Sequence, residues 1–233
     1  MTGQTLFLAG TVLVAGSYGL ALAGGGKEAK PSTSFAVARV HFEQNATDGD
    51  VEVVFEAKGG HEGLSKLTVV SPDGRTVVDF AAPDASTLGM RQFRFESPEP
   101  KDVQGLKSAY PEGVYTFTGA TAAGEKLHGT STLHHKLPST VSLIQPKAKA
   151  NGVSVKNLEI TWTPVKNLAA YIIYIEQDEL EVELTARLPG SEAKFLVPEG
   201  FLLPDTQYTL GIGTVTQDGN ASYVETWFIT AKE

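Results

Sequence analysis

Short runs of alternating apolar and polar residues, separated by turn-forming residues, recur along this chain from about residue 35 to its end. Val51, Val53 and Phe55, for example, are spaced by two, which gives a strand one apolar face. Between two later apolar runs stands Pro72–Gly74, where Pro can preset φ and Gly can accept a positive φ, so a hairpin is expected. No long segment has the periodicity of an amphipathic helix. These patterns predict an all-β chain.

The expected strands fall into two series separated by a hinge at Leu137–Ser139. In the first series they cover residues 51–56, 67–70, 76–80, 90–96, 114–118 and 126–134. The segment Pro98–Gly113 carries three prolines and only weak helical periodicity, so we expect a long loop with one helical turn. The chain beyond residue 34 is long enough for two domains of roughly 100 residues each. Two tandem β-sandwiches are therefore predicted, over residues 35–137 and 138–233.

The N-terminal segment indicates export. Residues 4–23 are apolar and uncharged and end in Ala21, Leu22 and Ala23, which is the small-residue pattern of a signal peptidase site. We predict a signal peptide over residues 1–23, a flexible linker over residues 24–34, and a periplasmic or secreted location. A membrane anchor is the alternative, since the run is just long enough to cross a bilayer. Its glycines and the position of the first basic residues after it favour cleavage, which leaves no membrane attachment.

Charge and cysteine content narrow the function classes. The net charge is −8, so binding to phosphate backbones is not expected, and we predict no nucleic-acid partner. The chain has no cysteine. An exported protein without disulfides must be stabilised by burial alone.

Three ordered features of residues 139–233 point to a family. Trp162 lies in an alternating strand, the segment Leu203–Tyr208 forms a corner before another strand, and Asp218–Asn220 supplies a turn before the last one. In this order they resemble a fibronectin type III domain. The resemblance implies a structural role for Trp162, in the core, and for Tyr208, whose hydroxyl would tie the corner to the backbone. No Arg-Gly-Asp sequence is present, so the resemblance does not imply integrin-type adhesion.

The first half carries looser motifs. Glu43–Asp50, Pro72–Arg75 and Tyr110–Tyr115 together resemble segments of exported bacterial proteins that end in a type III domain. This resemblance implies an immunoglobulin-like domain over residues 35–137, followed by the fibronectin type III domain over residues 138–233. It supplies no catalytic residue.

One acidic stretch could in principle bind a metal. Glu43, Asn45, Asp48 and Asp50 offer the oxygen ligands that suit calcium, although their spacing is not that of an EF-hand. A polar turn between two strands explains the same residue types, because Asn and Asp side chains bond to their own backbone. Calcium binding stays open at this point, and we predict no metal site.

Reaction centres are not apparent. The chain has no Gly-x-Ser-x-Gly elbow and no glycine-rich phosphate loop. His128 and His134 on one strand would be separated by roughly 20 Å, so they cannot share a zinc ion. We therefore predict a non-enzyme without catalytic residues or cofactors.

Three aromatic residues of the second half are the candidate ligand contacts. If the family's core positions face inward, alternation places Tyr174, Tyr223 and Trp227 on the outer side of their strands. Exposed aromatics provide large, rigid contact area. The predicted function is a noncatalytic exported protein that binds a protein or an envelope component such as a polysaccharide. The alternative is a carbohydrate-binding module that stacks sugars on these rings. Ordinary cross-strand pairing, or burial against the first domain, would explain the same residues without a ligand.

Overall fold

The computed structural model describes all residues except 1–32, 83–87, 99, 101 and 233. The predicted signal peptide, residues 1–23, and most of the predicted linker, residues 24–34, lie outside the described residues. Strands and a single short helix make up the secondary structure of the described chain, so the prediction of an all-β protein is confirmed. Among these residues, no helix is long and apolar enough to span a membrane.

The strands divide evenly between the two halves. The first half contains β1 (Thr33–Ser34), β2 (Val37–Asn45), β3 (Asp50–Lys58), β4 (Leu64–Val70), β5 (Thr76–Ala81), β6 (Gln92–Glu96), β7 (Gly113–Thr121) and β8 (Lys126–Leu133). The second half contains β9 (Leu143–Gln145), β10 (Ala150–Val153), β11 (Glu159–Trp162), β12 (Ala170–Gln177), β13 (Val182–Pro189), β14 (Lys194–Leu196), β15 (Gln207–Val215) and β16 (Ala221–Thr230). Thr33 and Ser34, which we assigned to the linker, pair instead with β8 as β1, so that prediction is wrong for these two residues.

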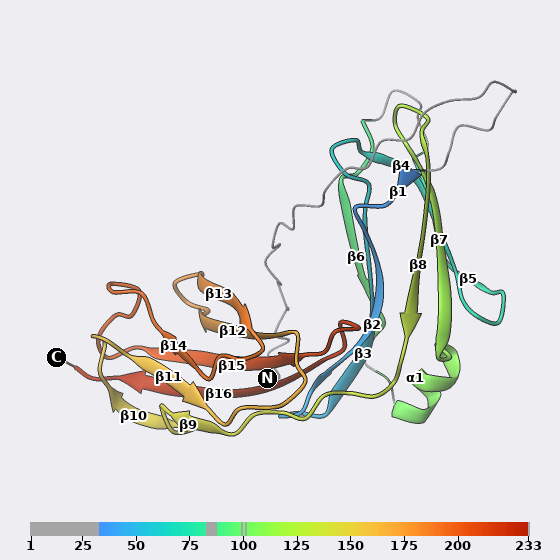
Figure 1. Ribbon diagram of the computed structural model, residues 1–233. Coiled ribbons are helices and arrows are strands. Elements are labelled where there is room, and N and C mark those ends of the chain that lie inside the picture. The colour runs from blue at the N-terminus through green and yellow to red at the C-terminus, as the bar shows by residue number, and fades with distance from the viewer. Residues whose placement is uncertain (1–32, 83–87, 99, 101, 233) are drawn as a thin grey trace, which may run out of the picture.

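Both halves have the same strand topology, although their sequences show no repeat. In the first half, strands β2, β3 and β6 pair side by side, and a second row runs β8–β7–β4–β5. In the second half, the corresponding rows are β9–β11–β14 and β16–β15–β12–β13. The chain visits the two rows in the same order in each half, and β1 and β10 are parallel additions to β8 and β16. Figure 1 shows the two halves meeting at a bend.

Each half encloses its own apolar core. The first core includes the fully buried residues Val40, Phe42, Val53, Leu64, Val69, Tyr115, Phe117 and Leu133. The second is centred on Trp162, which is 1% exposed and packs against Tyr171 with ring centroids 5.2 Å apart. The predicted core role of Trp162 is confirmed. Burying a large apolar side chain contributes about 1.5–3 kcal/mol, so two such cores can replace disulfides as the source of stability.

A tyrosine fixes a corner in each half. In the second, the hydroxyl of Tyr208 accepts a hydrogen bond of 2.9 Å from the Leu203 amide, as the family resemblance implied. In the first, the hydroxyl of Tyr115 donates to the Pro111 carbonyl over 3.1 Å. A tyrosine bonded to the backbone a few residues upstream is typical of immunoglobulin-like sandwiches.

Two local predictions can be compared directly with the structure. The turn between β4 and β5 forms as expected: the Ser71 amide donates to the Arg75 carbonyl over 2.9 Å, and Gly74 has a φ of 83°. The segment Pro98–Gly113 contains α1 (Val103–Ala109), which makes about two turns rather than the expected one. Asp102 caps this helix by accepting a bond of 2.6 Å from the Gly105 amide.

The two halves are joined by strand pairing. Strand β16 of the second half pairs in parallel with β2 of the first, with Ala221 opposite Glu43 and Tyr223 opposite Asn45. The result is one continuous sheet in the order β13–β12–β15–β16–β2–β3–β6, to which β10 adds beside β16. We call it the shared sheet. It includes the three-stranded row of the first half and the four-stranded row of the second.

Asn220, in the turn that precedes β16, anchors the second half to the first. Its side-chain oxygen accepts from the Phe42 amide over 2.9 Å, and its side-chain nitrogen donates to the carbonyls of His134 and Lys136 over 2.7 and 3.0 Å. Asn220 is 2% exposed, so these bonds are shielded from water. The turn at Asp218–Asn220 therefore does more than link β15 to β16, because it also connects the two halves.

Candidate functional site

The candidate site lies on the side of the shared sheet that faces away from both cores, which we call the outer face. In β12, Tyr171, Ile173 and Ile175 enter the core, so Tyr174 points to the outer face. In β2, Val40 and Phe42 enter the core, so His41 points the same way. The strand registers continue these outward-facing positions from the second half, through β15 and β16, into β2 and β3 of the first half. Residues distant in sequence are thereby placed on one surface.

Tyr174 and Tyr223 are on the outer face but are not exposed. Tyr174 is 5% and Tyr223 is 7% exposed, so the prediction that these rings project into solvent is wrong. The reason lies in β15 between them, where the outward positions are Gly211 and Gly213. A Cβ on Gly211 would meet the Tyr174 ring, and one on Gly213 would meet the Tyr223 ring, at 2.3 Å or less. The tyrosines therefore lie across the glycine backbone.

The two tyrosines form a small apolar cluster of their own. Their ring centroids are 6.3 Å apart, and Ala170, Val215 and Ala221 are buried with them. The Tyr174 hydroxyl hydrogen-bonds to the Glu225 carboxylate. Burial, reinforced by that bond, raises the pKa of Tyr174, and burial likewise raises the pKa of Tyr223. Both rings are neutral and held in place.

Trp227, the third predicted contact residue, is half-buried on the outer face opposite Thr209. The structure thus places all three aromatics on one face, as alternation predicted, but leaves only Trp227 partly open to solvent. A sugar-stacking platform would need exposed ring faces. The carbohydrate-binding alternative therefore loses two of its three rings.

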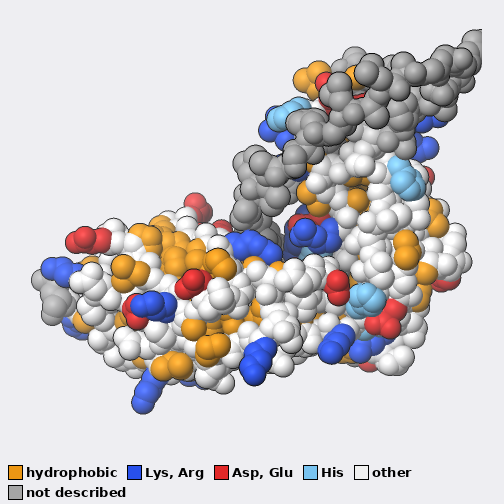
Figure 2. Space-filling model, in the orientation of Figure 1, with side chains coloured by type: hydrophobic (Ala, Val, Ile, Leu, Met, Phe, Trp, Pro, Cys, Tyr) orange, Lys and Arg blue, Asp and Glu red, His pale blue; other side chains and the backbone are white. Residues whose placement is uncertain are grey.

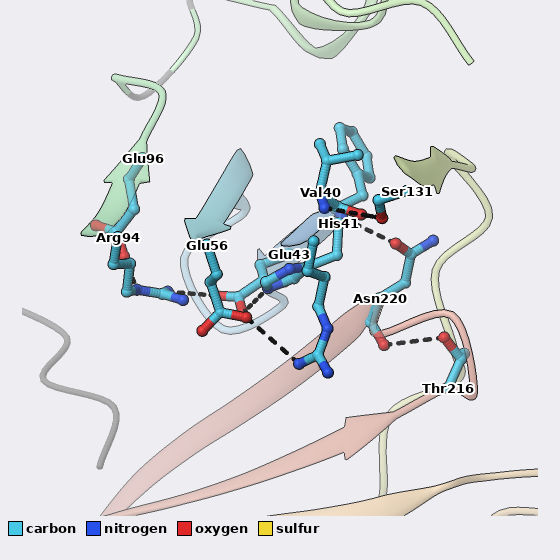
Figure 3. A network of polar contacts seen from close by, with 11 residues as sticks. Val40, His41, Glu43, Glu56, Arg94, Glu96, Ser131, Thr216 and Asn220 are labelled. Atoms are coloured by element: carbon cyan, nitrogen blue, oxygen red, sulfur yellow. Dashed lines mark hydrogen bonds and ion pairs between the residues drawn. The ribbon is translucent and has the colours of Figure 1, made fainter. Parts of the chain in front are cut away.

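Charged side chains form a network where the first half meets β16 (Figure 3). His41 is hydrogen-bonded through Nε2 to one oxygen of Glu43 over 2.7 Å, and Arg94 contacts the other oxygen over 3.1 Å. Arg94 also donates to Glu96 over 2.6 Å. Burial by itself would raise the pKa of Glu43, but the bonds and charges of His41 and Arg94 outweigh it and hold the pKa below its usual range. Glu43 is thus a buried anion with two partners.

Glu52 lies beside this network and behaves differently. Burial, reinforced by the negative charges of Glu96, Glu43 and Asp50, raises the pKa of Glu52 to about 8. Such a shift can mark a catalytic acid. The cavity beside it, however, has a volume of about 10 Å³, which is the size for about one water molecule. No substrate fits between Glu52 and Tyr223.

The candidate calcium ligands bond to their own turn and to neighbouring side chains, and the Asn45 side-chain nitrogen donates to Asp48 over 3.3 Å. The Asn45 side chain accepts from the Thr47 amide over 3.0 Å, and Asp48 accepts from the Asp50 amide over 3.0 Å. Glu43 is directed instead at His41 and Arg94. The bonds of Asn45 and Asp48 are those of a polar turn between two strands. Within the described part of the chain, no group of three or more His, Cys, Asp or Glu side chains is placed to hold a metal.

Sequence reasoning missed the charged network and the joining role of Asn220. One signal was present: Arg39, His41 and Glu43 alternate with Val40 and Phe42, which marks an outer polar face. Their partners could not be found in this way. Arg94 comes from β6, 51 residues after Glu43, and reaches it only across β3.

The outer face is also rich in arginine. Three of the five arginines of the chain, Arg39, Arg94 and Arg187, lie on this face by register. The side chain of Arg39 is half exposed and pairs with Glu56 over 3.3 Å, and Arg187 is exposed. Figure 2 shows basic side chains gathered in the bend between the halves. Arg39 and Arg94 are paired with carboxylates of the same face, so this surface carries charges of both signs.

Comparisons with known proteins concern the fold. No family model and no curated protein matches the chain. Similar solved structures are the fibronectin(III)-like modules of Clostridium thermocellum CbhA, with 12% identity, a TM-score of 0.35 and coverage of 84% of this chain and 91% of that one. A two-domain fibronectin type III segment of chicken tenascin has 12% identity and a TM-score of 0.33, with coverage of 84% and 99%. A tandem repeat from the extending region of a large adhesion protein has 11% identity and a TM-score of 0.30, with coverage of 84% of this chain and 50% of that one.

The structural neighbours of this chain are thus fibronectin type III modules. The fold and the described site together define an all-β protein with two apolar cores and a shared sheet. At such low identity and TM-score, nothing about a ligand or partner follows from the neighbours.

Proposed function

We propose that this chain is a noncatalytic exported interaction protein, built from an immunoglobulin-like domain and a fibronectin type III domain held at a fixed angle. Its outer face would bind a protein partner of the cell envelope. The observation that carries the proposal is that Arg39, Arg187 and Trp227 all lie on one face of a continuous sheet. Arg and Trp are enriched at protein interfaces and at their energetic centres.

Rigidity supports a binding role. Contacts between domains of one chain are commonly small and permit relative motion. Here the halves share backbone pairing, and Glu225 donates its amide to the Thr47 hydroxyl over 2.7 Å across the boundary. A surface that is ordered before binding loses less entropy when a partner arrives. The buried tyrosines contribute by stiffening this surface.

The same geometry supports a noncatalytic role. The pKa of Glu52 is raised to about 8, as in some catalytic acids, yet the cavity beside Glu52 admits about one water molecule. The buried pair of Glu43 and Arg94 satisfies itself. Glu52 and the Glu43–Arg94 pair lie near the strand pairing that joins the halves. Their burial there accounts for their charge states without a substrate.

The binding surface can be tested with truncated contacts. Arg187→Ala and Trp227→Ala should each weaken capture of an envelope protein by about tenfold or more, since truncating a central interface residue costs over about 1 kcal/mol. Lys126→Ala, on the exposed side of β8, is the matched control and should bind like the unchanged protein. Affinity for envelope fractions is measured by surface plasmon resonance, with the captured protein identified by mass spectrometry. Equal binding by all variants would contradict the proposed surface.

Export and the sugar alternative need separate measurements. Protein recovered outside the cytoplasm should begin at Gly24, as N-terminal sequencing would show, if the signal peptide ends at Ala23. A glycan array distinguishes the partner classes. Strong binding to a glycan that is lost in Trp227→Ala would replace the protein partner with a polysaccharide.

A further inference from the structure

The end of the second half that lies away from the first half, which we call the distal end, carries two surfaces of opposite charge. One is the β12–β13 hairpin tip, whose exposed residues are Asp178, Glu179, Leu180 and Glu181. The other is a groove between β9, β10 and the start of β11, bordered by Lys147 and Lys156. Neither belongs to the outer-face site described above.

The groove has an apolar floor and a basic rim. Its volume is about 300 Å³, near the lower limit of ligand pockets. Pro146 and Leu158 are buried in the floor, whereas Lys147 and Lys156 are exposed at the rim. Among the described residues, no carboxylate lies within ion-pair distance of either lysine; the nearby Glu159 pairs with Lys194 over 3.0 Å. The rim thus offers two cations without internal partners.

The hairpin tip has the complementary chemistry. Leu180 is 48% exposed at its apex, between carboxylates that form no ion pair with the described Lys and Arg side chains. At the base of the hairpin, burial, reinforced by the charges of Glu183 and Asp178, raises the pKa of Glu176. An apolar side chain flanked by anions matches an apolar floor flanked by cations.

Strand register puts the tip and the groove at the same end of the molecule. Glu176 lies opposite Thr209, which lies opposite Trp227, while Ala150 in β10 lies opposite Phe228. The tip is therefore level with the groove, at the other edge of the sheet. Three strand spacings separate β10 from β12, which is about 15 Å. In Figure 2, carboxylates project from the upper edge of this half and Lys and Arg side chains from its lower side.

Further exposed leucines occupy the same end. Leu196 is 57% exposed and is opposite Glu159, next to the groove floor, and Leu203 is 47% exposed beside the end of β16. Together with Leu180 they add exposed apolar area at this end of the second half. The distal end thus combines apolar contact area with separated charges of both signs.

We propose that the distal end binds a second copy of this chain, with the hairpin tip of each copy seated in the groove of the other. A two-fold dimer uses the same surface of both copies, so each copy must present tip and groove on one surface. The distal end does so, and both contacts can therefore form together. A second copy has the matching chemistry: its Leu180 meets the floor around Leu158, and its carboxylates meet Lys147 and Lys156. The first halves then point away from each other.

Charge reversal with exchange tests the pairing. The Lys147→Glu/Lys156→Glu variant and the Glu179→Lys/Glu181→Lys variant should each be monomeric, because tip and groove then carry the same sign. Mixed together, the two variants should form a one-to-one dimer, since both contacts regain opposite signs. Sedimentation velocity of the full chain measures this. Lys66→Glu/Lys126→Glu, in the first half, makes the same change in net charge as the groove variant and should dimerise like the unchanged protein.

Salt separates this contact from nonspecific association. Dimerisation should be strong in about 10 mM salt, where the Debye length is about 30 Å, and should fall sharply in about 1 M salt, where it is about 3 Å. Leu180→Ser should weaken it further at every salt concentration. An unchanged protein that stays monomeric in low salt, or a mixture of reversed variants that stays monomeric, would overturn the proposal. The outer-face variants Arg187→Ala and Trp227→Ala should dimerise normally, so failure here is distinguishable from failure of the proposed function.

Discussion

The two halves of the molecule have one strand topology but enter the shared sheet through different rows. The first half contributes its three-stranded row through β2, and the second contributes its four-stranded row through β16. The two halves are therefore not joined by equivalent surfaces. Each open edge of a sandwich presents unpaired backbone groups that must be protected. Here an edge of one half covers an edge of the other.

The two halves differ on their outer faces rather than in their cores. The cores around Phe42 and Trp162 are similar in composition, since both bury aromatic and aliphatic side chains between two rows of strands. The outer faces are not. That of the first half carries the buried ion network of Glu43 and Arg94, whereas that of the second carries Tyr174 and Tyr223 over glycines. Joined, they form one surface with charges at one side and aromatics at the other.

The largest expected effect comes from removing the anchor between the halves. Asn220→Ala leaves the Phe42 amide and two carbonyls without their partner, and a buried polar group left unsatisfied costs about 1–3 kcal/mol. We expect the free energy of unfolding to fall by about 2–3 kcal/mol and the halves to unfold in separate steps. Urea denaturation followed by tryptophan fluorescence reports the second half, and hydrogen exchange in β3 reports the first.

The control is Asn151→Ala, because Asn151 is exposed in β10. It should change the free energy of unfolding by no more than about 0.5 kcal/mol. If Asn220→Ala unfolded in one step by both probes, with an unchanged free energy of unfolding, the anchor role would be refuted.

The tyrosine corners allow a matched comparison between halves. Tyr208→Phe and Tyr115→Phe each remove one hydroxyl that bonds to the backbone, which costs about 1 kcal/mol. Tyr208→Phe should cost more, because it strands an amide donor, whereas Tyr115→Phe strands a carbonyl, and orphaned amides are tolerated less well. Thermal unfolding by calorimetry measures the order. Tyr110→Phe is the control, since within the described chain no hydrogen bond of the Tyr110 hydroxyl is found. A larger loss for Tyr115→Phe than for Tyr208→Phe would contradict the explanation from the stranded amide.

A pH dependence is expected in the first half. Because the pKa of Glu52 is raised to about 8 in the folded protein, the folded state holds a proton that the unfolded state releases near its ordinary pKa. The contribution of Glu52 to stability is therefore complete in acid and is lost as the pH rises toward 8. Glu52→Gln should remove this loss and be the more stable form at pH 8, measured by urea denaturation at several pH values. If the free energy of unfolding of both proteins changed with pH in the same way, the raised pKa of Glu52 would be disproved.

Local chemistry explains which predictions from the sequence succeeded. The Ser71–Arg75 turn, the core position of Trp162 and the corner at Tyr208 each depend on residues a few positions apart or on a family pattern. The cap at Asp102 was also local, but α1 buries only Leu106, so its periodicity was weak. Pattern reasoning works where a short segment contains its own determinants.

Predictions about exposure failed where a neighbouring strand decided the outcome. Alternation correctly assigned Tyr174 and Tyr223 to the outer face, but their burial depends on Gly211 and Gly213 in the strand between them. Strand order and register were needed to bring these four residues together. The pairing of Glu43 with Arg94 likewise required β6 to lie beside β3.

The sequence by itself determined an all-β chain, its turns, the core tryptophan and the corner tyrosine, because alternation and turn chemistry act over a few residues. Only the tertiary structure decided that β16 pairs with β2 and that the two halves share one sheet. Strand pairing is a contact between backbones, which all sequences have in common, so side-chain patterns leave the partner strand unspecified. The outer face, which we propose as the binding surface, is a product of that pairing.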